Sequence, residues 1–149
     1  MKSQHFNHMI AMKPEKETNK KFGVQPDASF DYFNRIIYWE LEEGLWYTPD
    51  LIEAQMAQLE NVTETDKHGL LVNATFNAVI NLECMEQLIK NESPFRNAIA
   101  IVTGGNLATF MMAKFYISTM TIKTPIKLFK SQDQARVWLM EHNLQSDKE

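Results

Sequence analysis

The sequence is poor in cysteine, and this limits the kinds of site that it can build. Cys84 is the single cysteine among 149 residues, which excludes an internal disulfide and a cysteine-based zinc site. A lone cysteine also fits a reducing compartment. The N-terminus lacks the succession of basic stub, apolar core and small-residue cleavage site that marks an export signal. We therefore expect a cytoplasmic protein.

A long uninterrupted hydrophobic run is absent as well. Between Arg96 and Lys123 the only charged residue is Lys114, and a segment of this length is sufficient to cross a bilayer. However, threonine, serine and asparagine residues dilute the segment, and Gly104 and Gly105 divide it into a strand-like and a helix-like piece. We therefore expect no membrane span here.

Charge is distributed unevenly along the chain. Residues 1–28 carry five lysines and three acidic residues, whereas residues 29–149 carry ten basic and sixteen acidic side chains. Binding of DNA or RNA depends on clustered lysine and arginine side chains that neutralise phosphates. The acidic balance of residues 29–149 therefore argues against a nucleic acid as the partner.

Length and composition predict one domain between two polar segments. With 149 residues, 44% of them apolar, the chain fits a single ordinary core. Residues 1–28 are polar and aperiodic and are interpreted as a mobile leader, residues 29–143 as the domain, and residues 144–149 as a polar tail. Hydrophobic periodicity then predicts the elements. Strands are expected at 30–34, 37–41, 68–75, 97–103 and 126–129, and helices at 48–64, 81–91, 106–120 and 131–142.

Local signals mark where these elements begin and turn. Asn34-Arg35 is the expected turn between the first two strands. The order β-β-α-β-α-β-α-β-α predicts an α/β fold, a mixed sheet with helices packed on it, because crossover helices make the later strands parallel. The expected helix N-caps are Thr48, Asn81, Asn106 and Ser131.

Three short motifs carry a family resemblance. An A-x-A-x-V strand at Ala98–Val102 leads into a helix, a P-x-K-x-F strand follows at Pro125–Phe129, and an A-x-x-W-L helix at Ala135–Leu139 closes the domain. With the element order, these motifs resemble the SpoIIAA-like (STAS, anti-sigma-factor antagonist) fold, and more specifically the uncharacterised bacterial STAS/SEC14-like proteins, over roughly residues 29–143. The resemblance implies a fold and no particular activity.

The chain departs from this family at its regulatory motif. Antagonists of this fold carry a phosphorylatable serine in an Asp-x-Ser-Gly turn between the third strand and the second helix, where this chain reads NATFNAVINLEC. Thr75 lies nearby, but neither the serine nor the glycine is present. A phosphorylation switch is therefore not expected.

Thr103, Gly104, Gly105 and Asn106 form the candidate ligand-binding segment. They join a strand to a helix, where free backbone N–H groups and the helix dipole can face an anion. Ligands of open α/β sheets bind at this end of the strands. The G-x-G-x-x-G and P-loop patterns are both absent. A simple bend capped by Asn106 is the competing interpretation, and the sequence leaves both open.

Other reactive groups lack recognisable partners. Cys84 falls near a helix start, where the dipole lowers a thiol pKa, but no histidine is spaced to act as its base, so a buried structural cysteine is expected. The acidic run at 40–43 is expected at a solvated strand edge. His5 and His8 have the spacing of two metal ligands, yet no third ligand completes a set. We expect no metal, no cofactor and no catalytic residue.

The helix expected at 106–120 is apolar around most of its circumference, so something besides the sheet must cover it. Met112, Phe115 and Tyr116 are the candidate interface residues. The leading hypothesis is a non-enzymatic protein-interaction or regulatory module that contacts a protein partner or itself, expected as a homodimer. The alternative is a small-molecule or lipid-binding protein with a pocket near Thr103–Asn106, as the SEC14-like resemblance implies.

Overall fold

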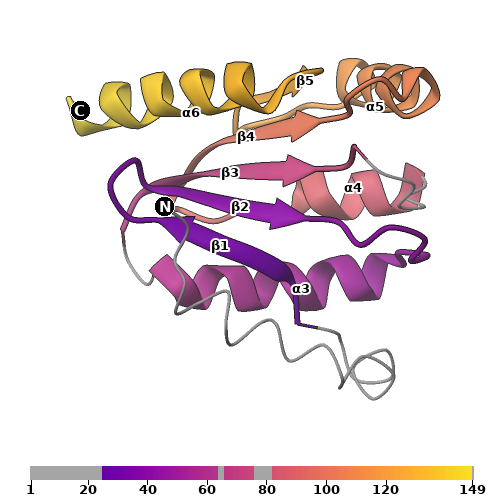
Figure 1. Cartoon of the computed structure of the whole chain (residues 1–149), viewed down its shortest axis with the longest axis horizontal. Coiled ribbons are helices and arrows are strands. Elements are labelled where there is room, and N and C mark those ends of the chain that lie inside the picture. The colour runs from indigo at the N-terminus through magenta and orange to yellow at the C-terminus, as the bar shows by residue number, and fades with distance from the viewer. Residues whose placement is uncertain (1–24, 64–65, 76–81, 149) are drawn as a thin grey trace.

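The computed structural model describes residues 25–63, 66–75 and 82–148, and it has the predicted order of elements (Figure 1). The strands are β1 (Asp27–Asp31), β2 (Ile36–Glu40), β3 (His68–Asn73), β4 (Arg96–Val102) and β5 (Ile126–Phe129). The helices are α3 (Pro49–Thr63), α4 (Leu82–Lys90), α5 (Leu107–Thr119) and α6 (Gln132–Asp147). This order confirms the α/β class.

The five strands form one mixed sheet. They lie side by side in chain order, β1-β2-β3-β4-β5. β1 pairs with β2 antiparallel, and each later neighbour pair is parallel. The parallel pairs follow from the crossover helices, as the sequence predicts. The carboxyl ends of β2, β3, β4 and β5 therefore meet at one edge of the sheet.

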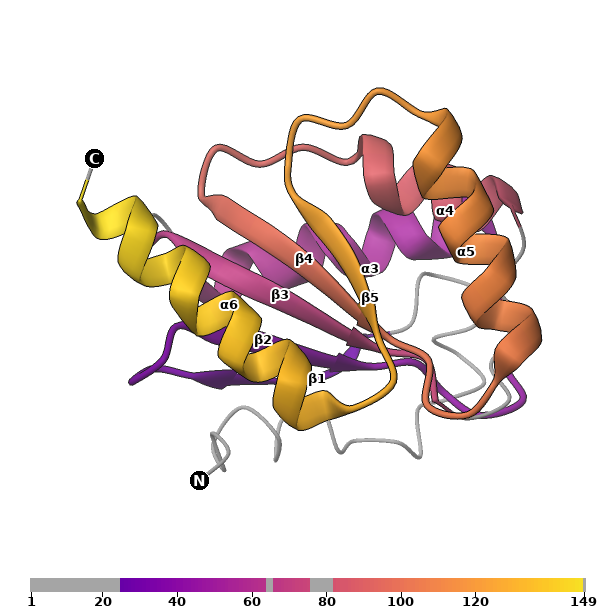
Figure 2. The same ribbon diagram turned by 90° about the horizontal axis from the view of Figure 1, so that it is seen from above.

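Helices cover the two faces of the sheet unequally. In Figure 2, α6 crosses in front of the strands and α3 lies behind them. The larger core cluster joins α3, α4 and α5 to one face, and a smaller one joins α6 to the other. Within the described ranges, no helix combines the length and apolarity of a membrane span. The described domain is thus a three-layer α/β/α arrangement with α6 alone on one side.

Small residues let α6 approach the sheet closely. Ala98 and Ala100 are fully buried in the cluster beneath this helix. A Cβ built on Gly69 would lie 2.9 Å from Leu139 Cδ2, so the glycine makes room for that leucine. The glycine is therefore a packing requirement of the layer.

The first hairpin differs from the expected one. Its first strand ends at Asp31, and residues 32–35 form the turn, so the expected two-residue turn at Asn34-Arg35 is wrong. The Asp31 carboxylate accepts hydrogen bonds from the backbone N–H groups of Phe33 (3.0 Å) and Asn34 (3.1 Å). This side chain ends the strand, because it offers the backbone an alternative to the ladder.

Both boundaries of the domain extend beyond the expected ones. β1 begins at Asp27, inside the segment assigned to the leader, because Ala28 is buried in the larger core. α6 continues to Asp147 and so includes most of the segment assigned to the polar tail. Asn143 is one reason for the longer helix. Its side-chain amide donates hydrogen bonds to the backbone oxygens of Asn34 (2.8 Å) and Arg35 (3.0 Å), which connect the last turns of α6 to the hairpin.

Three of the four expected N-caps are confirmed. The side-chain oxygen of Thr48 accepts from the Leu51 N–H at the start of α3. Asn106 caps α5 and Ser131 caps α6 in the same way. The fourth expected cap, Asn81, lies outside the described residues. Short-range side-chain chemistry therefore determines where these helices begin.

Candidate functional site

The carboxyl edge of the sheet holds a polar network after β3. The Asn73 amide donates to Glu40 Oε2 at 2.8 Å. Asn73 Oδ1 accepts from the Thr75 hydroxyl and, at 3.0 Å, from the Thr75 backbone N–H. Glu40, expected at a solvated strand edge, is half-buried and takes part in this network. The edge is therefore an ordered surface held by side-chain hydrogen bonds.

The glycine turn lies next to this network. The Thr103 backbone N–H donates to Phe129 O (2.9 Å), and the Asn106 N–H donates to Thr103 O (3.2 Å). Gly104 has a φ of +60°, and a Cβ built on it would lie 2.6 Å from Thr75 Cγ2. The structure thus brings the turn after β4 against Thr75, the threonine that follows β3.

The two glycines differ in their surroundings. Gly105 is exposed, and a Cβ built on it would meet nothing within 4 Å. Beyond it, the Asn106 side chain accepts from the Thr109 N–H at 3.1 Å, which uses one free donor of the first turn of α5. The start of α5 is therefore open to solvent on the Gly105 side.

Thr103 is the unusual residue of the turn. It is fully buried, and its hydroxyl has no hydrogen-bond partner among the residues that the structure describes. An unsatisfied buried hydroxyl costs about 1–3 kcal/mol, so a water molecule or a ligand that accepted its hydrogen bond would be stabilised there. The sequence predicts that Thr103 lies at the carboxyl edge of the sheet. Its burial depends on tertiary packing, which a local sequence pattern does not predict.

α5 divides the three candidate interface residues between two sides. Met112 and Tyr116 are half-buried and pack against the larger core, whereas Phe115 is 63% exposed. Leu107 and Met111, at the same side as Phe115, are 63% and 60% exposed. Sequence reasoning missed these two, although the i, i+4, i+8 spacing of the three residues places them on one stripe. The outer stripe of α5 is thus Leu107, Met111 and Phe115.

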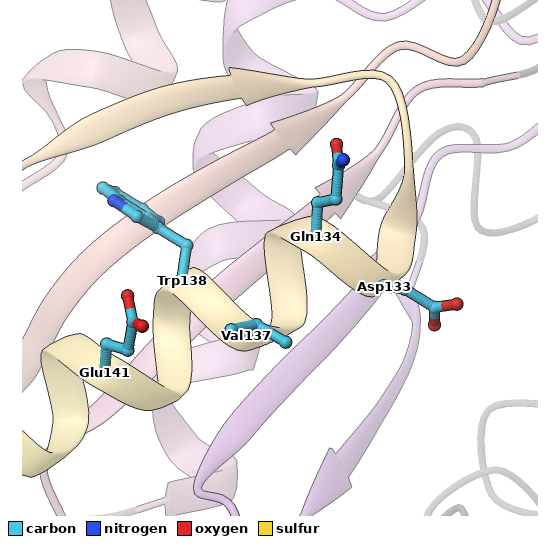
Figure 3. Close-up of a pocket in the computed structure, with 5 residues that line it drawn as sticks. All are labelled: Asp133, Gln134, Val137, Trp138 and Glu141. Atoms are coloured by element: carbon cyan, nitrogen blue, oxygen red, sulfur yellow. The ribbon is translucent and has the colours of Figure 1, made fainter.

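Two cavities lie away from the glycine turn. A shallow groove of about 350 Å³ runs along the outer side of α6 (Figure 3). A second cavity, of about 330 Å³, lies between the C-terminal half of α6 and the segment before β5. No residue of the Thr103–Asn106 turn lines either one. The residues that line the α6 groove are Asp133, Gln134, Val137, Trp138 and Glu141.

The opposite edge of the sheet contains a buried ionic network. Arg96 Nη2 lies 2.5 Å from Glu60 Oε2, and Arg96 Nη1 donates to Asn91 O at 2.7 Å. Burial lowers the pKa of both His68 and Arg96. The His68 ring nitrogen Nδ1 lies 2.9 Å from Asp66 O. These groups connect α3 to β4, and their geometry is that of an ion pair and hydrogen bonds that stabilise the fold.

The remaining candidates are structural or surface residues. Cys84 is buried and its thiol donates to Tyr47 O at 3.0 Å, an arrangement that suits a core cysteine. Glu43 is exposed. No cluster of three potential metal ligands occurs among the residues that the structure describes. His5 and His8 lie outside the described residues.

Comparison with known proteins identifies the family. The family model described as a domain of unknown function (DUF7793) matches residues 30–143. This range runs from within β1 into the last turns of α6, so it includes all nine elements of the described domain at least in part. No curated protein and no solved structure matches the chain. The chain therefore belongs to the DUF7793 family.

Proposed function

We propose that this protein is a non-enzymatic interaction module of the SpoIIAA-like fold that associates with a second copy of itself through α5. The observation that carries this proposal is the outer stripe of α5, where three large apolar side chains are each at least 60% exposed. Removing such side chains from water contributes roughly 25 cal/mol per Å² of apolar surface, against which the entropic cost of association is set. A helix that is apolar on its outer side needs a cover beyond its own sheet.

Phe115→Glu is expected to weaken self-association at least tenfold, because it places a charge within the apolar contact. Analytical ultracentrifugation over a concentration series measures the dissociation constant. Phe115 is a better position for this substitution than Met112. Met112 packs against the core, so a charge at Met112 would disturb folding as well as association.

Trp46→Glu provides the matched control. Trp46 is a large aromatic residue, 75% exposed, in the loop before α3. This variant is expected to associate like the unchanged protein. An unchanged protein that stays monomeric up to millimolar concentration would refute self-association.

The second candidate function is binding of a small anionic ligand at the Thr103–Asn106 turn. The specific observation in its favour is the buried Thr103 hydroxyl, for which residues 25–63, 66–75 and 82–148 offer no hydrogen-bond partner. The open space at Gly105 and the backbone N–H groups at the start of α5 add room and positive potential. The turn precedes α5, and the outer stripe begins at Leu107 directly after it, so a ligand at the turn would lie beside one end of the stripe.

Thermal unfolding with phosphate, nucleotides, flavins and fatty acids tests this candidate. A ligand at a hundred times its dissociation constant adds roughly 2.7 kcal/mol, which moves the midpoint by several degrees. The shift is expected to disappear in Gly105→Asp, which fills the open space with a negative charge. If no compound in the panel moves the midpoint, the turn is only a bend.

A further inference from the structure

The outer surfaces of α5 and α6 have a similar apolar character and opposite charge. We call the first the α5 face and define it by its apolar stripe, Leu107, Met111 and Phe115, with Lys114 and Lys130 beside it. The second is the α6 groove, which is lined by Asp133, Gln134, Val137, Trp138 and Glu141. Each surface is a helix side on which exposed apolar residues lie beside charged residues, lysines on the α5 face and carboxylates in the α6 groove.

The α5 face is basic. α5 contains no Asp or Glu, and Lys114 lies between Met111 and Phe115 in the sequence. The Lys114 and Lys130 ammonium groups lie 5.9 Å and 5.8 Å from the centre of the Phe110 ring, so both stand beside the same turn of α5. Of the five basic side chains in residues 93–132, a stretch with no acidic residue, Lys114 and Lys130 are the two placed beside this face. Pairing these lysines therefore requires anionic groups, such as carboxylates, on the surface that covers this face.

The α6 groove meets that requirement. It is lined by the carboxylates of Asp133 and Glu141 and by the apolar side chains of Val137 and Trp138, and Val137 is 50% exposed (Figure 3). Asp133, Val137 and Glu141 follow one another at four-residue spacing, so they form a single stripe about 12 Å long. No basic residue lines the groove.

Basic side chains do occur close to the groove. They reduce its negative charge but do not make it positive. Arg136 Nη2 lies 3.6 Å from Asp133 Oδ1, an exposed pair that contributes little. Lys127 lies over the Phe129 ring, which in turn packs against Trp138. Glu141 has neither of these contacts, which makes it the carboxylate best placed to receive a lysine from outside.

The positions of the two surfaces decide between the modes of contact. α5 belongs to the core on one face of the sheet and α6 to the core on the other, so the two cannot meet within one molecule. A symmetric α5-to-α5 contact would bring two basic faces together with no carboxylate on either helix to pair with the lysines, which is electrostatically unfavourable. An α5-to-α6 contact pairs lysines with carboxylates.

We infer that self-association is head-to-tail, with the α5 face of one copy seated in the α6 groove of a second copy. This inference rests on the proposed self-association and adds which surfaces meet. Apolar contact between Phe115 or Met111 and Val137 supplies the affinity, and the lysines and carboxylates set the orientation. Because each copy in such a pair still has one free surface, the contact either closes into a ring or extends into a chain.

Mixing two blocked variants tests the inference. Phe115→Glu introduces a charge that prevents contact through the α5 face, and Val137→Lys does the same for the α6 groove. Each variant alone is expected to be monomeric at concentrations where the unchanged protein associates. A mixture retains one intact α5 face and one intact α6 groove, so it is expected to form a one-to-one dimer in size-exclusion chromatography. Raising the salt concentration is expected to weaken this dimer.

The outcomes separate this inference from the proposed function. If Phe115→Glu is monomeric while Val137→Lys associates like the unchanged protein, the contact is α5-to-α5, and head-to-tail association is wrong although self-association stands. If the unchanged protein is monomeric, both are wrong. Met111→Glu and Glu141→Lys provide a second pair of exposed positions, and a mixture of these that stays monomeric would also contradict the inference. Circular dichroism confirms that each variant is folded.

Discussion

Glu60→Gln is expected to lower the free energy of unfolding by about 3 kcal/mol. The Arg96 side chain is 1% exposed, and Glu60, at 2.5 Å, is the carboxylate that balances its charge. Removing one partner of a buried pair leaves the other charge without compensation, which is more costly than the pair is worth. Glu60 is 26% exposed, so the loss is expected at the lower end of the range for buried pairs. Urea unfolding at pH 7 measures the change.

Replacing both partners separates the charge effect from packing. Glu60→Met combined with Arg96→Met removes the charge and keeps most of the volume, so the double variant is expected to be more stable than Glu60→Gln alone. Three hydrogen bonds to neighbouring residues are lost in it, from Arg96 to Asn91 O and Asn91 Oδ1 and from Ser93 to Glu60, which prevents full recovery. If Glu60→Gln lost less than about 1 kcal/mol, the network would be no stronger than a surface ion pair.

The sequence predicts the fold well wherever a signal is local. Hydrophobic periodicity locates the described strands and helices, and N-cap chemistry at Thr48, Asn106 and Ser131 gives the helix starts, because these interactions span a few residues. The hairpin itself is predicted, but the position of its turn is wrong because a carboxylate, Asp31, competes with the ladder. The C-terminal end of α6 is not predicted, because the residue that holds it in place, Asn143, contacts a turn 108 residues earlier in the chain.

The candidate site is predicted only in part, for the same physical reason. The glycine turn is visible in the sequence, but the contact between Gly104 and Thr75 joins two loops that are adjacent only in the folded sheet. The apolar surface of α5 is visible as well. Its division into a buried side with Met112 and an exposed side with Met111 depends on the angle at which α5 meets the sheet, which the helical pattern alone does not specify.

Gly104→Ala is expected to destabilise the protein by about 2–4 kcal/mol. Part of the loss, about 1–2 kcal/mol, comes from holding an alanine at a φ of +60°. The rest comes from the new Cβ, which would lie 2.6 Å from Thr75 Cγ2. Thr75 does not move freely, because Asn73 holds both its hydroxyl and its backbone N–H. Thermal or urea unfolding measures the total.

Two further variants show what each glycine contributes. Thr75→Ser removes the methyl group and keeps the hydroxyl, so Gly104→Ala in that background is expected to lose only the backbone part. Gly105→Ala is expected to be neutral or to stabilise by up to about 1 kcal/mol, since Gly105 lies outside the left-handed region and has open space around it. Equal losses at the two positions would contradict this division. With the expected result, Gly104 is needed for the bend, whereas folding does not need Gly105, whose open surface is then free for a ligand at the start of α5.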